Sequence, residues 1–384
     1  MRTLKALILL PMIFSATGRA QTTAPADQRT TVTEKLVGHL DPSSALLQSL
    51  AFSPDGRRMA YVAKAGKKLF VVVDGKAEKP YDGIGERLLF SPDSRRMAYA
   101  AKVGAKQFVV VDGKEETPYD GIGDLLFSPD SRRMAYSAKE GKTWIVVVDG
   151  NEEKPYDGLA GLLFSPDSRR VAYSAHAGEK WVVVVDGKEE KPYDRVGEGP
   201  IFSPDSRRVA YSAIVGAEWF VVVDGKEEKP YDAIAPPSFS PDSRRVAYAA
   251  QVGEKWIVVV DGKEEKPYDG IGVGNLLFST DSSRVAYLAQ VGKKWIVVVD
   301  GKEEKPYDNI VGNLTFSPDS RRVAYSAHAG EKWFVVVDGK EGKPYDGFPK
   351  GTKLIFDSAS VLHYVVGMGT ASGLDFYLVE EAFY

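Results

Sequence analysis

The sequence predicts an all-β protein, a single β-propeller built from four-stranded antiparallel blades. Three observations predict this fold class: an internal repeat of 37 to 39 residues, two tight turn signals in each repeat, and no apolar period of 3.6 residues. Each repeat carries Phe-Ser-Pro-Asp-Ser-Arg-Arg, then Val-Val-Val-Asp-Gly-Lys and Lys-Pro-Tyr-Asp, or close variants of these three words. The repeated phenylalanines are Phe52, Phe90, Phe127, Phe164, Phe202, Phe239, Phe278 and Phe316. Helical solenoids need the missing helical period, and a parallel β-helix would not need two hairpin turns per unit.

Residues 200–236 illustrate the four strands that each repeat is expected to form, here called A to D. A Pro-Asp-Ser turn separates A from B, a loop around Gly216 separates B from C, and Asp-Gly separates C from D. Proline presets the first turn, and Asp-Gly is the strongest short hairpin signal. The expected strands are residues 200–203, 207–213, 219–223 and 226–232.

The polarity of the strands predicts their order in space. Strand A is apolar on both faces, as in Leu276, Leu277 and Phe278, and strand C is nearly as apolar. Strand D is charged and contains a proline, which cannot donate to a sheet ladder. We therefore expect A on the inside and D on the exposed outer edge, the arrangement of a propeller blade.

The two ends of the repeat region predict about nine blades. Residues 353–366 resemble a degenerate A–B pair with Phe356 at the repeated phenylalanine position, and residues 374–379 could supply strand C. No strand D follows, but residues 33–37 resemble one. The prediction is eight full repeats plus one composite blade closed by the N-terminal strand, because an open ring would leave sheet edges unpaired. Eight blades with the ends packed outside the ring is the alternative.

The chain divides into three predicted segments. Residues 1–20 read as a signal peptide cleaved near Ala20, with a positive start at Arg2 and Lys5 followed by a short apolar run. Residues 21–31 are polar and expected to be flexible, and residues 32–384 form the propeller. The protein is therefore expected to be periplasmic or secreted, without a membrane span after cleavage. An uncleaved anchor is the alternative.

Composition excludes several function classes. The chain has no cysteine, which removes disulfides, thiolate nucleophiles, lipid-modified cysteine and cysteine zinc sites. Losing the three positive charges of residues 1–20 would change the formal net charge from −3 to −6. This mild acidity gives no electrostatic reason to expect nucleic acid or an anionic membrane as a partner.

The turn between strands A and B carries a resemblance to a known family. The first copy, residues 53–58, reads Ser-Pro-Asp-Gly-Arg-Arg and resembles the repeated word of TolB-like, WD-type β-propellers, which also occurs in propellers of the prolyl oligopeptidase family. The resemblance covers roughly residues 45–348 and implies blade architecture without naming a ligand. The hydrolase domain of the oligopeptidases is not expected, because no Gly-x-Ser-x-Gly occurs and Ser372 has the wrong spacing.

No catalytic, cofactor or metal site is predicted. A residue that occurs eight times is unlikely to be a unique catalytic group, and the aspartates of Val-Asp-Gly-Lys do not have calcium-loop spacing. The glycines near Gly369 lack phosphate-loop spacing and are expected to form a hairpin. Of the paired arginines, one is expected to cap its own turn and the other to be exposed. The six tryptophans that open strand C are expected to pack between blades, with a row of sugar platforms as the alternative.

Differences between the repeats predict where a partner would bind. They lie in the B–C loops and in the D–A loops, such as residues 83–87, 195–199, 233–237 and 270–275, and a meander places both loop types on one face. We expect a non-enzymatic scaffold that binds a protein or peptide there, although drift without selection would give the same pattern. The alternatives are a carbohydrate, small-molecule or enzymatic site at the channel mouth and a self-associating structural protein. The candidate residues are Lys67, Lys106, Lys142, His176, Arg195, Glu218, Asn275, Asn313 and His328.

Overall fold

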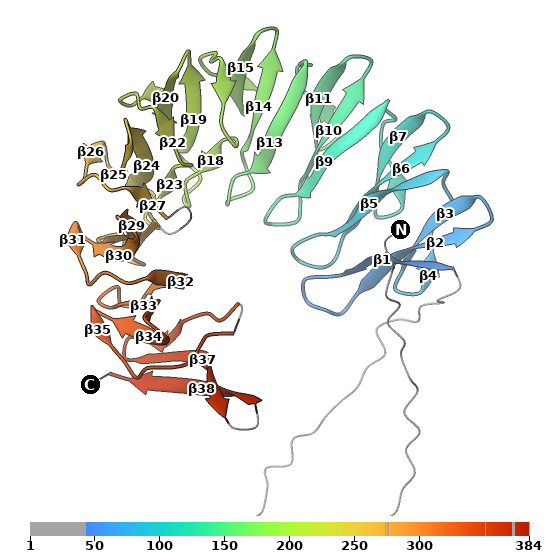
Figure 1. Ribbon diagram of the computed structural model, residues 1–384. Coiled ribbons are helices and arrows are strands. Elements are labelled where there is room, and N and C mark those ends of the chain that lie inside the picture. The colour runs from blue at the N-terminus through green and yellow to red at the C-terminus, as the bar shows by residue number, and fades with distance from the viewer. Residues whose placement is uncertain (1–43, 273, 275, 350, 371–372, 384) are drawn as a thin grey trace, which may run out of the picture. The chain divides into compact units, whose positions relative to one another are not determined.

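The computed structural model describes residues 44–383 except 273, 275, 350 and 371–372. The regular secondary structure of these described residues consists of β-strands alone. The strands form nine antiparallel sheets that follow one another in chain order (Figure 1). The sheets belong to one compact unit, Gly38–Tyr384. This is the predicted β-propeller of about nine blades. The signal peptide, the flexible segment and the closing N-terminal strand lie outside the described residues.

The strands of each blade are connected as a meander. Blades 1 to 4 consist of β1 (Ala45–Phe52), β2 (Met59–Ala65), β3 (Lys68–Val73) and β4 (Lys76–Ala77); β5 (Gly83–Phe90), β6 (Met97–Val103), β7 (Lys106–Val111) and β8 (Lys114–Glu115); β9 (Gly121–Phe127), β10 (Met134–Glu140), β11 (Thr143–Val148) and β12 (Asn151–Glu152); and β13 (Gly158–Phe164), β14 (Val171–Ala177), β15 (Lys180–Val185) and β16 (Lys188–Glu189).

In blades 5 to 7 the first strand is split in two. These blades consist of β17 (Arg195–Val196), β18 (Ile201–Phe202), β19 (Val209–Val215), β20 (Glu218–Val223) and β21 (Lys226–Glu227); β22 (Ala233–Ile234), β23 (Ser238–Phe239), β24 (Val246–Val252), β25 (Lys255–Val260) and β26 (Lys263–Glu264); and β27 (Gly270–Ile271), β28 (Leu277–Phe278), β29 (Val285–Val291), β30 (Lys294–Val299) and β31 (Lys302–Glu303). Blades 8 and 9 consist of β32 (Asn309–Phe316), β33 (Val323–Ala329), β34 (Lys332–Val337) and β35 (Lys340–Glu341); and β36 (Ile355–Ser358), β37 (Val361–Thr370) and β38 (Gly373–Ala382).

In blades 1 to 4 and in blade 8 the first strand is longer than the four residues predicted for strand A. In blade 2 it begins at Gly83, inside the predicted D–A loop, and its pairing with β6 shifts between Ile84 and Leu88. Glycine accommodates this bulge, because a Cβ added at Gly85 would lie 3.2 Å from the Cβ of Ala100. The predicted D–A loops are therefore wholly or partly strand, and the sequence pattern was wrong about their conformation.

The fourth strand is shorter than predicted. In blade 5 it covers only Lys226–Glu227, and the chain pairs again with β20 at the isolated bridge between Trp219 and Tyr231. Pro230 lies between the two paired stretches and has no N–H to donate. Although this strand is otherwise charged, Tyr231 is buried.

The predicted Asp-Gly hairpins join the third and fourth strands. Asp186 and Gly187 have φ angles of 52° and 73°, so both central residues lie in the left-handed region that this two-residue turn requires. The Asp186 carboxylate also accepts the backbone N–H of Val171 at 3.0 Å, which ties the hairpin to strand β14.

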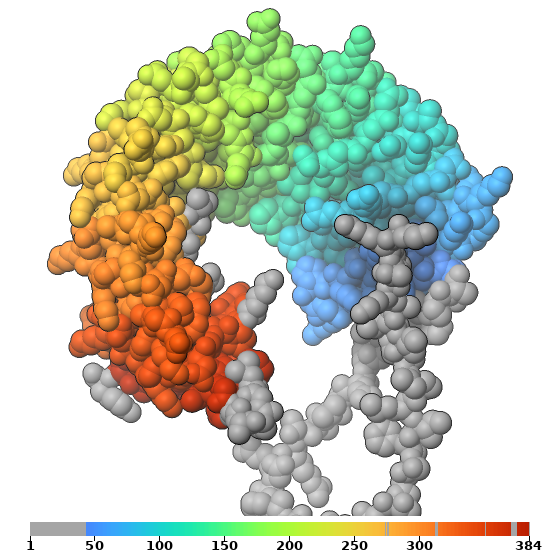
Figure 2. Space-filling view, viewed as in Figure 1, coloured from blue at the N-terminus to red at the C-terminus, as the bar shows by residue number. Residues whose placement is uncertain are grey.

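The hydrophobic core is divided among the interfaces between successive blades. At the interface of blades 3 and 4, Val146 and Val148 pack with Phe164, Tyr173 and Val182. Figure 2 shows the neighbouring blades in contact along the chain. Each blade thus buries its apolar faces against its neighbours, as expected for a repeat architecture.

The two terminal blades depart from the repeat. Blade 9 has three described strands in the order β36-β37-β38, which confirms the predicted glycine-rich hairpin. The guanidinium of Arg322 lies 4.9 Å from the ring centre of Phe383, at the place where earlier arginines cover the repeated phenylalanine. Phe383 rather than Phe356 therefore fills this place, because the third strand is long enough to bring its end there. In blade 1, Phe52 is 58% exposed, whereas Phe90 is 7% exposed.

Candidate functional site

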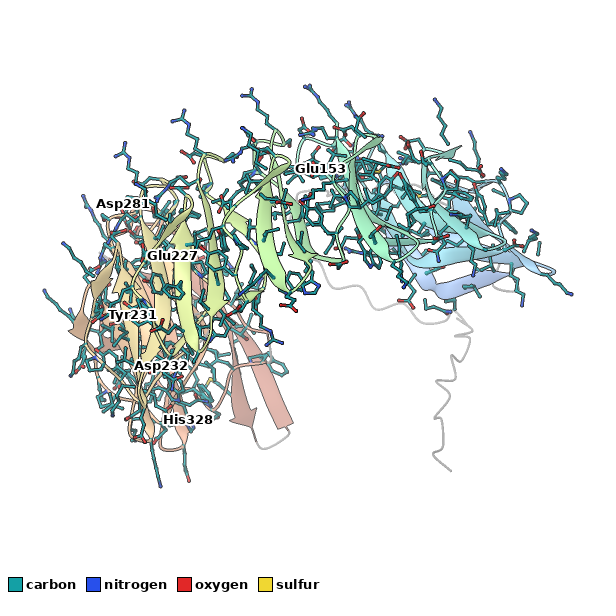
Figure 3. All side chains as sticks on the ribbon, turned by 90° about the horizontal axis from the view of Figure 1, so that it is seen from above. Glu153, Glu227, Tyr231, Asp232, Asp281 and His328 are labelled. Atoms are coloured by element: carbon teal, nitrogen blue, oxygen red, sulfur yellow. The ribbon has the colours of Figure 1, made fainter. Side chains whose placement is uncertain are left out.

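The blades present two unlike rims. The uniform rim consists of the Ser-Pro-Asp turns and the Asp-Gly turns, and the variable rim consists of the B–C turns and the segments between strands D and A. Figure 3 shows Asp281, from the Ser-Thr-Asp turn that blade 7 has in place of Ser-Pro-Asp, at one edge and Asp232 and His328 at the opposite edge. Glu227 and Tyr231 lie between them on blade 5. The structure therefore places the turns that are alike in every repeat on one rim and the segments that differ between repeats on the other, as predicted.

A hydrogen-bond network fixes each turn of the uniform rim. The Ser165 hydroxyl donates to Asp167 at 2.6 Å and accepts the backbone N–H of Arg170 at 2.9 Å. The backbone N–H of Asp167 donates to Ser206 of the next blade at 2.9 Å. The Ser165 hydroxyl and then the backbone N–H of Arg169 hold the pKa of Asp167 below its usual range. This carboxylate therefore stays ionised and serves the turn.

The second arginine of each pair joins neighbouring blades. Arg170 donates from Nε to Asp186 at 2.8 Å and from an Nη atom to the carbonyls of Ser206 and Arg207 at 3.1 and 3.0 Å. Its guanidinium lies 5.1 Å from the ring centre of Phe202. The sequence-based interpretation, in which one guanidinium caps its own turn, is wrong, since a backbone N–H does this instead. The structure gives the second arginine an interface role.

A tyrosine–glutamate network crosses the middle of each interface. Tyr173 donates to Glu153 of the preceding blade at 2.7 Å, and its ring packs edge-on against Tyr156 at 6.2 Å. Tyr156 and Lys154 in turn bond Glu189 of the next blade at 2.8 and 2.7 Å. Burial, followed by the bond to Glu153, raises the pKa of Tyr173 well above its usual range. The sequence did not predict this network, although the tyrosine of Lys-Pro-Tyr-Asp recurs in every repeat.

The variable rim has a fixed frame beneath its differing side chains. Asp308 accepts the Lys294 ammonium at 2.5 Å and the backbone N–H of Gly330, in the next B–C turn, at 2.8 Å. Lys294 and then this backbone N–H lower the pKa of Asp308. In blades 2 to 9 the turn after the second strand is thereby tied to the end of the preceding blade, so that differing side chains project from a common backbone.

The lysine candidates have different surroundings. Lys67 and Lys142 are exposed in B–C turns, and neither has an ion-pair partner among the residues that the structure describes. Lys106 instead begins β7 and lies 2.9 Å from Asp120 and 3.3 Å from Glu140. These carboxylates, Asp120 above all, raise the pKa of Lys106. Lys106 is therefore part of the frame, whereas Lys67 and Lys142 are available to a partner.

The two histidine candidates lie in strands β14 and β33, not in the predicted loops. His176 packs on Trp181 with 5.1 Å between ring centres, and His328 packs on Trp333 at 4.6 Å. All four side chains are half-buried. The second strand is seven residues long in every full blade, so it includes this position, where each histidine faces a tryptophan directly across the ladder. Each pair forms a small aromatic surface on the variable rim.

Arg195 and Glu218 are the exposed charged candidates of blade 5. Arg195 begins β17, and Glu218 begins β20 at a position where six other blades have lysine. With Glu218 there, Asp232 retains only the backbone N–H of Gly253, at 2.6 Å, as a bonding partner among the described residues. Blade 5 therefore presents two carboxylates, Glu218 and Asp232, where blades 4 and 6 have a lysine–aspartate ion pair.

The remaining candidates give less information. Asn275 lies outside the described residues, and Asn313 lies in β32 with a side chain that is also outside them. The seven described candidates come from six blades, so the structure places them on one rim without gathering them into one cluster. Among the described residues, no group of three or more His, Cys, Asp or Glu side chains is arranged to hold a metal ion. No helix in the same part of the chain is suited to crossing a membrane.

A groove of about 650 Å³ lies along the first strands of blades 2 to 4. Its floor includes Leu89 and Leu125, and the exposed side chains of Glu86, Arg87 and Asp124 line it. The groove depends on Gly123, because a Cβ there would lie 2.5 Å from the Ser137 hydroxyl. The sequence did not predict it, since it combines segments about one repeat apart, although two of them are predicted D–A loops.

No family model and no curated protein matches this chain. Solved structures with a similar fold include the Dos1 propeller (12% identity, 87% of this chain and 91% of that chain, TM-score 0.35) and TolB from Acinetobacter baumannii (14% identity, 73% and 77%, TM-score 0.29). The β-propeller domain of the trilobed protease from Pyrococcus furiosus is similar over 65% and 91% of the two chains (16% identity, TM-score 0.32). At these values the likenesses carry no functional argument. The structures to which the chain is similar are β-propellers.

Proposed function

We propose that this protein is an exported, non-enzymatic β-propeller whose variable rim binds a protein or peptide partner in the cell envelope. One observation carries the proposal: side chains that differ from blade to blade project from a backbone frame in which an aspartate accepts the same glycine N–H in blades 2 to 9. The bonds from Asp308 to Lys294 and to the N–H of Gly330 exemplify this frame. Rigid scaffolds with differing edge residues are a common way to build a recognition surface.

The chemistry of the variable rim favours a polypeptide partner. The rim combines unpaired cations at Lys67 and Lys142, a carboxylate at Glu218 and the two histidine–tryptophan pairs. Aromatic and arginine side chains supply much of the binding energy of protein interfaces, and mixed charges supply specificity. Export rests on the leader-like residues 1–20 and implies a periplasmic or secreted location.

The test uses residues 21–384 and two charge-reversal variants. The first changes Lys67, Lys142 and Arg195 to Glu on the variable rim. The second changes Lys188, Lys226 and Lys263, which are exposed on the uniform rim, to Glu. Proteins captured from an envelope extract of the native host are identified by mass spectrometry. We expect the first variant to lose partners that the wild type and the second variant retain.

Equal capture by all three proteins would contradict binding at the variable rim. Because both variants change the formal charge by the same amount, a general electrostatic effect would reduce capture by both. A matching melting temperature for the three proteins shows that the fold is intact.

The groove favours a second candidate, a carbohydrate or other small-molecule site. Glu86, Arg87 and Asp124 supply unlike polar groups above an apolar floor, a combination typical of small-ligand sites. The test is a thermal-shift screen of oligosaccharides against the wild type and an Arg87→Ala, Asp124→Ala variant. A ligand that stabilises only the wild type would support this candidate, and no stabilising ligand would leave the variable rim as the better proposal.

A further inference from the structure

The uniform rim carries a row of exposed arginines. They are the first arginines of the paired set, Arg57, Arg95, Arg132, Arg169, Arg207, Arg244 and Arg321. Arg95 and Arg244 have side chains that are 86% exposed, and among the described residues each has one ion-pair contact, with the aspartate of the same turn at 4.0 Å. Figure 3 shows a row of long nitrogen-tipped side chains along the edge where Asp281 lies. These guanidinium groups face solvent with their hydrogen-bonding capacity largely unused.

The fold does not need these guanidinium groups. In the turns that contain this arginine, its backbone N–H donates to the aspartate, as from Arg169 to Asp167 at 3.1 Å. Blade 7 has Ser283 at this position, and its N–H makes the same bond to Asp281 at 3.0 Å, to which the Ser283 hydroxyl adds a bond at 2.8 Å. Arg245 still reaches the carbonyl of Ser283 at 3.1 Å. Serine therefore preserves the turn and the interface, and the arginine side chain is free for another role.

A second cation per blade lies on the same rim. The residue after each Asp-Gly turn is an exposed lysine in seven of the eight repeats: Lys76, Lys114, Lys188, Lys226, Lys263, Lys302 and Lys340. None of them has an ion-pair partner among the described residues. The aspartates of this rim are already bonded within the turns or to the second arginine, as Asp186 is to Arg170. The carboxylates of this rim therefore have partners within the fold, whereas the first arginines and these lysines keep exposed donors that a ligand could use.

Shallow hollows recur between blades along this rim. Those between blades 1 and 2, 3 and 4, and 6 and 7 have volumes of about 430, 430 and 400 Å³. In the first, Lys76 lies on one blade and Arg95 on the next, with the paired Arg58 and Asp74 between them. Glu78 and Asp112 also line this hollow, and Tyr99 and Arg96 bond them at 2.6 and 3.1 Å. Among the described residues, Lys76 and Arg95 are therefore the cations of the hollow that keep most of their hydrogen-bond donors free, beside a space large enough for a small anionic group.

We propose that the uniform rim binds a linear polyanion other than nucleic acid, whose repeated groups are phosphates or sulfates. A guanidinium group can donate two parallel hydrogen bonds to such an oxyanion, and successive blades would bind successive groups of one polymer. The overall affinity can be high although each contact is weak, because every contact after the first forms within an existing complex. In blades 2 to 8 the repeated phenylalanine rings at this rim lie beneath arginines, as Phe202 lies beneath Arg170. Phe52 of blade 1 is exposed, but among the described blades 2 to 8 the covered rings do not form the row of exposed stacking platforms that favours single-stranded nucleic acid.

The test measures binding of fluorescent long-chain inorganic polyphosphate, heparin and single-stranded DNA to residues 21–384 at several salt concentrations. The variant is Arg95→Ser, Arg132→Ser and Arg169→Ser, which uses the residue that blade 7 has naturally. The matched control is Lys67→Ser, Lys142→Ser and Lys293→Ser, which removes three exposed charges from the variable rim. Equal melting temperatures establish that all three proteins are folded.

We expect the arginine variant to bind polyphosphate or heparin about tenfold or more weakly at low salt, with a shallower salt dependence, because fewer counterions are released. The lysine control should stay within about twofold of the wild type. Preference for polyphosphate or for heparin identifies phosphate or sulfate as the recognised group. Equal losses in both variants, no binding of either polymer, or tighter binding of DNA would overturn the proposal. Capture of a partner by the variable rim is measured separately and does not depend on this result.

Discussion

Buried tyrosine hydroxyl groups lie at every interface between full blades, and their partners should decide how much each contributes to stability. Tyr173 donates to Glu153 at 2.7 Å, whereas the buried hydroxyl of Tyr136 has no hydrogen-bond partner among the described residues. Tyr173→Phe should lower the free energy of unfolding by about 1–3 kcal/mol, because it leaves the Glu153 carboxylate without a donor. Tyr136→Phe should change it by less than about 0.5 kcal/mol or raise it, as measured by urea unfolding.

The two substitutions form a matched pair at the scale of single residues. Each removes one oxygen from a ring that packs edge-on against another tyrosine with 6.2 Å between ring centres, Tyr119 in one case and Tyr156 in the other. The loss of packing is therefore the same. Equal destabilisation by both would show that the bond to Glu153 contributes nothing measurable.

At the scale of the element, the turn between the first two strands should depend on its second arginine only. Arg170→Ala removes the bonds to Asp186 and to two carbonyls of the next blade, and should lower the free energy of unfolding by about 1–3 kcal/mol. Arg169→Ala removes an exposed side chain and should change it by less than about 0.5 kcal/mol. Thermal and urea unfolding of both variants tests this. A larger effect of Arg169→Ala would contradict the assigned roles.

The same turn shows how far the sequence could predict the structure. The repeat, the Pro-Asp turn and the Asp-Gly hairpin are local signals, and they predicted the blades and both rims correctly. Arg170 bonds the carbonyls of Ser206 and Arg207, 36 and 37 residues away, and no local signal separates it from Arg169. The groove beside Glu86 and Asp124 was missed for the same reason, because it exists only when neighbouring blades pack. Tertiary contacts also extend strands into segments that glycine marks as loops.

At the scale of the whole molecule, the same hydrogen-bonded titratable groups recur in successive blades. This repetition should make the free energy of unfolding strongly dependent on pH. The turn aspartates, such as Asp167, have pKa values lowered by the serine hydroxyl and a backbone N–H. On the other rim, the hydrogen bond from Lys294 lowers the pKa of Asp308. A lowered pKa in the folded state contributes stability above the unfolded value of about 4, and that stability is lost as the pH falls below it. Many such groups should therefore lose their contributions together under acid conditions.

The tyrosines predict a second loss of stability at alkaline pH. Burial, followed by Glu115, raises the pKa of Tyr81 to about 12, so the neutral phenol is favoured in the folded state. A raised pKa contributes stability that is present below the unfolded value of about 10 and is lost as the pH rises toward 12. The melting temperature, followed by circular dichroism from pH 2 to pH 12, should be nearly constant from about pH 5 to pH 9 and fall on both sides. If the melting temperature were constant between pH 5 and pH 3, the ionised aspartates would not stabilise the blades. If the alkaline fall began well below pH 10, groups other than these tyrosines would cause it.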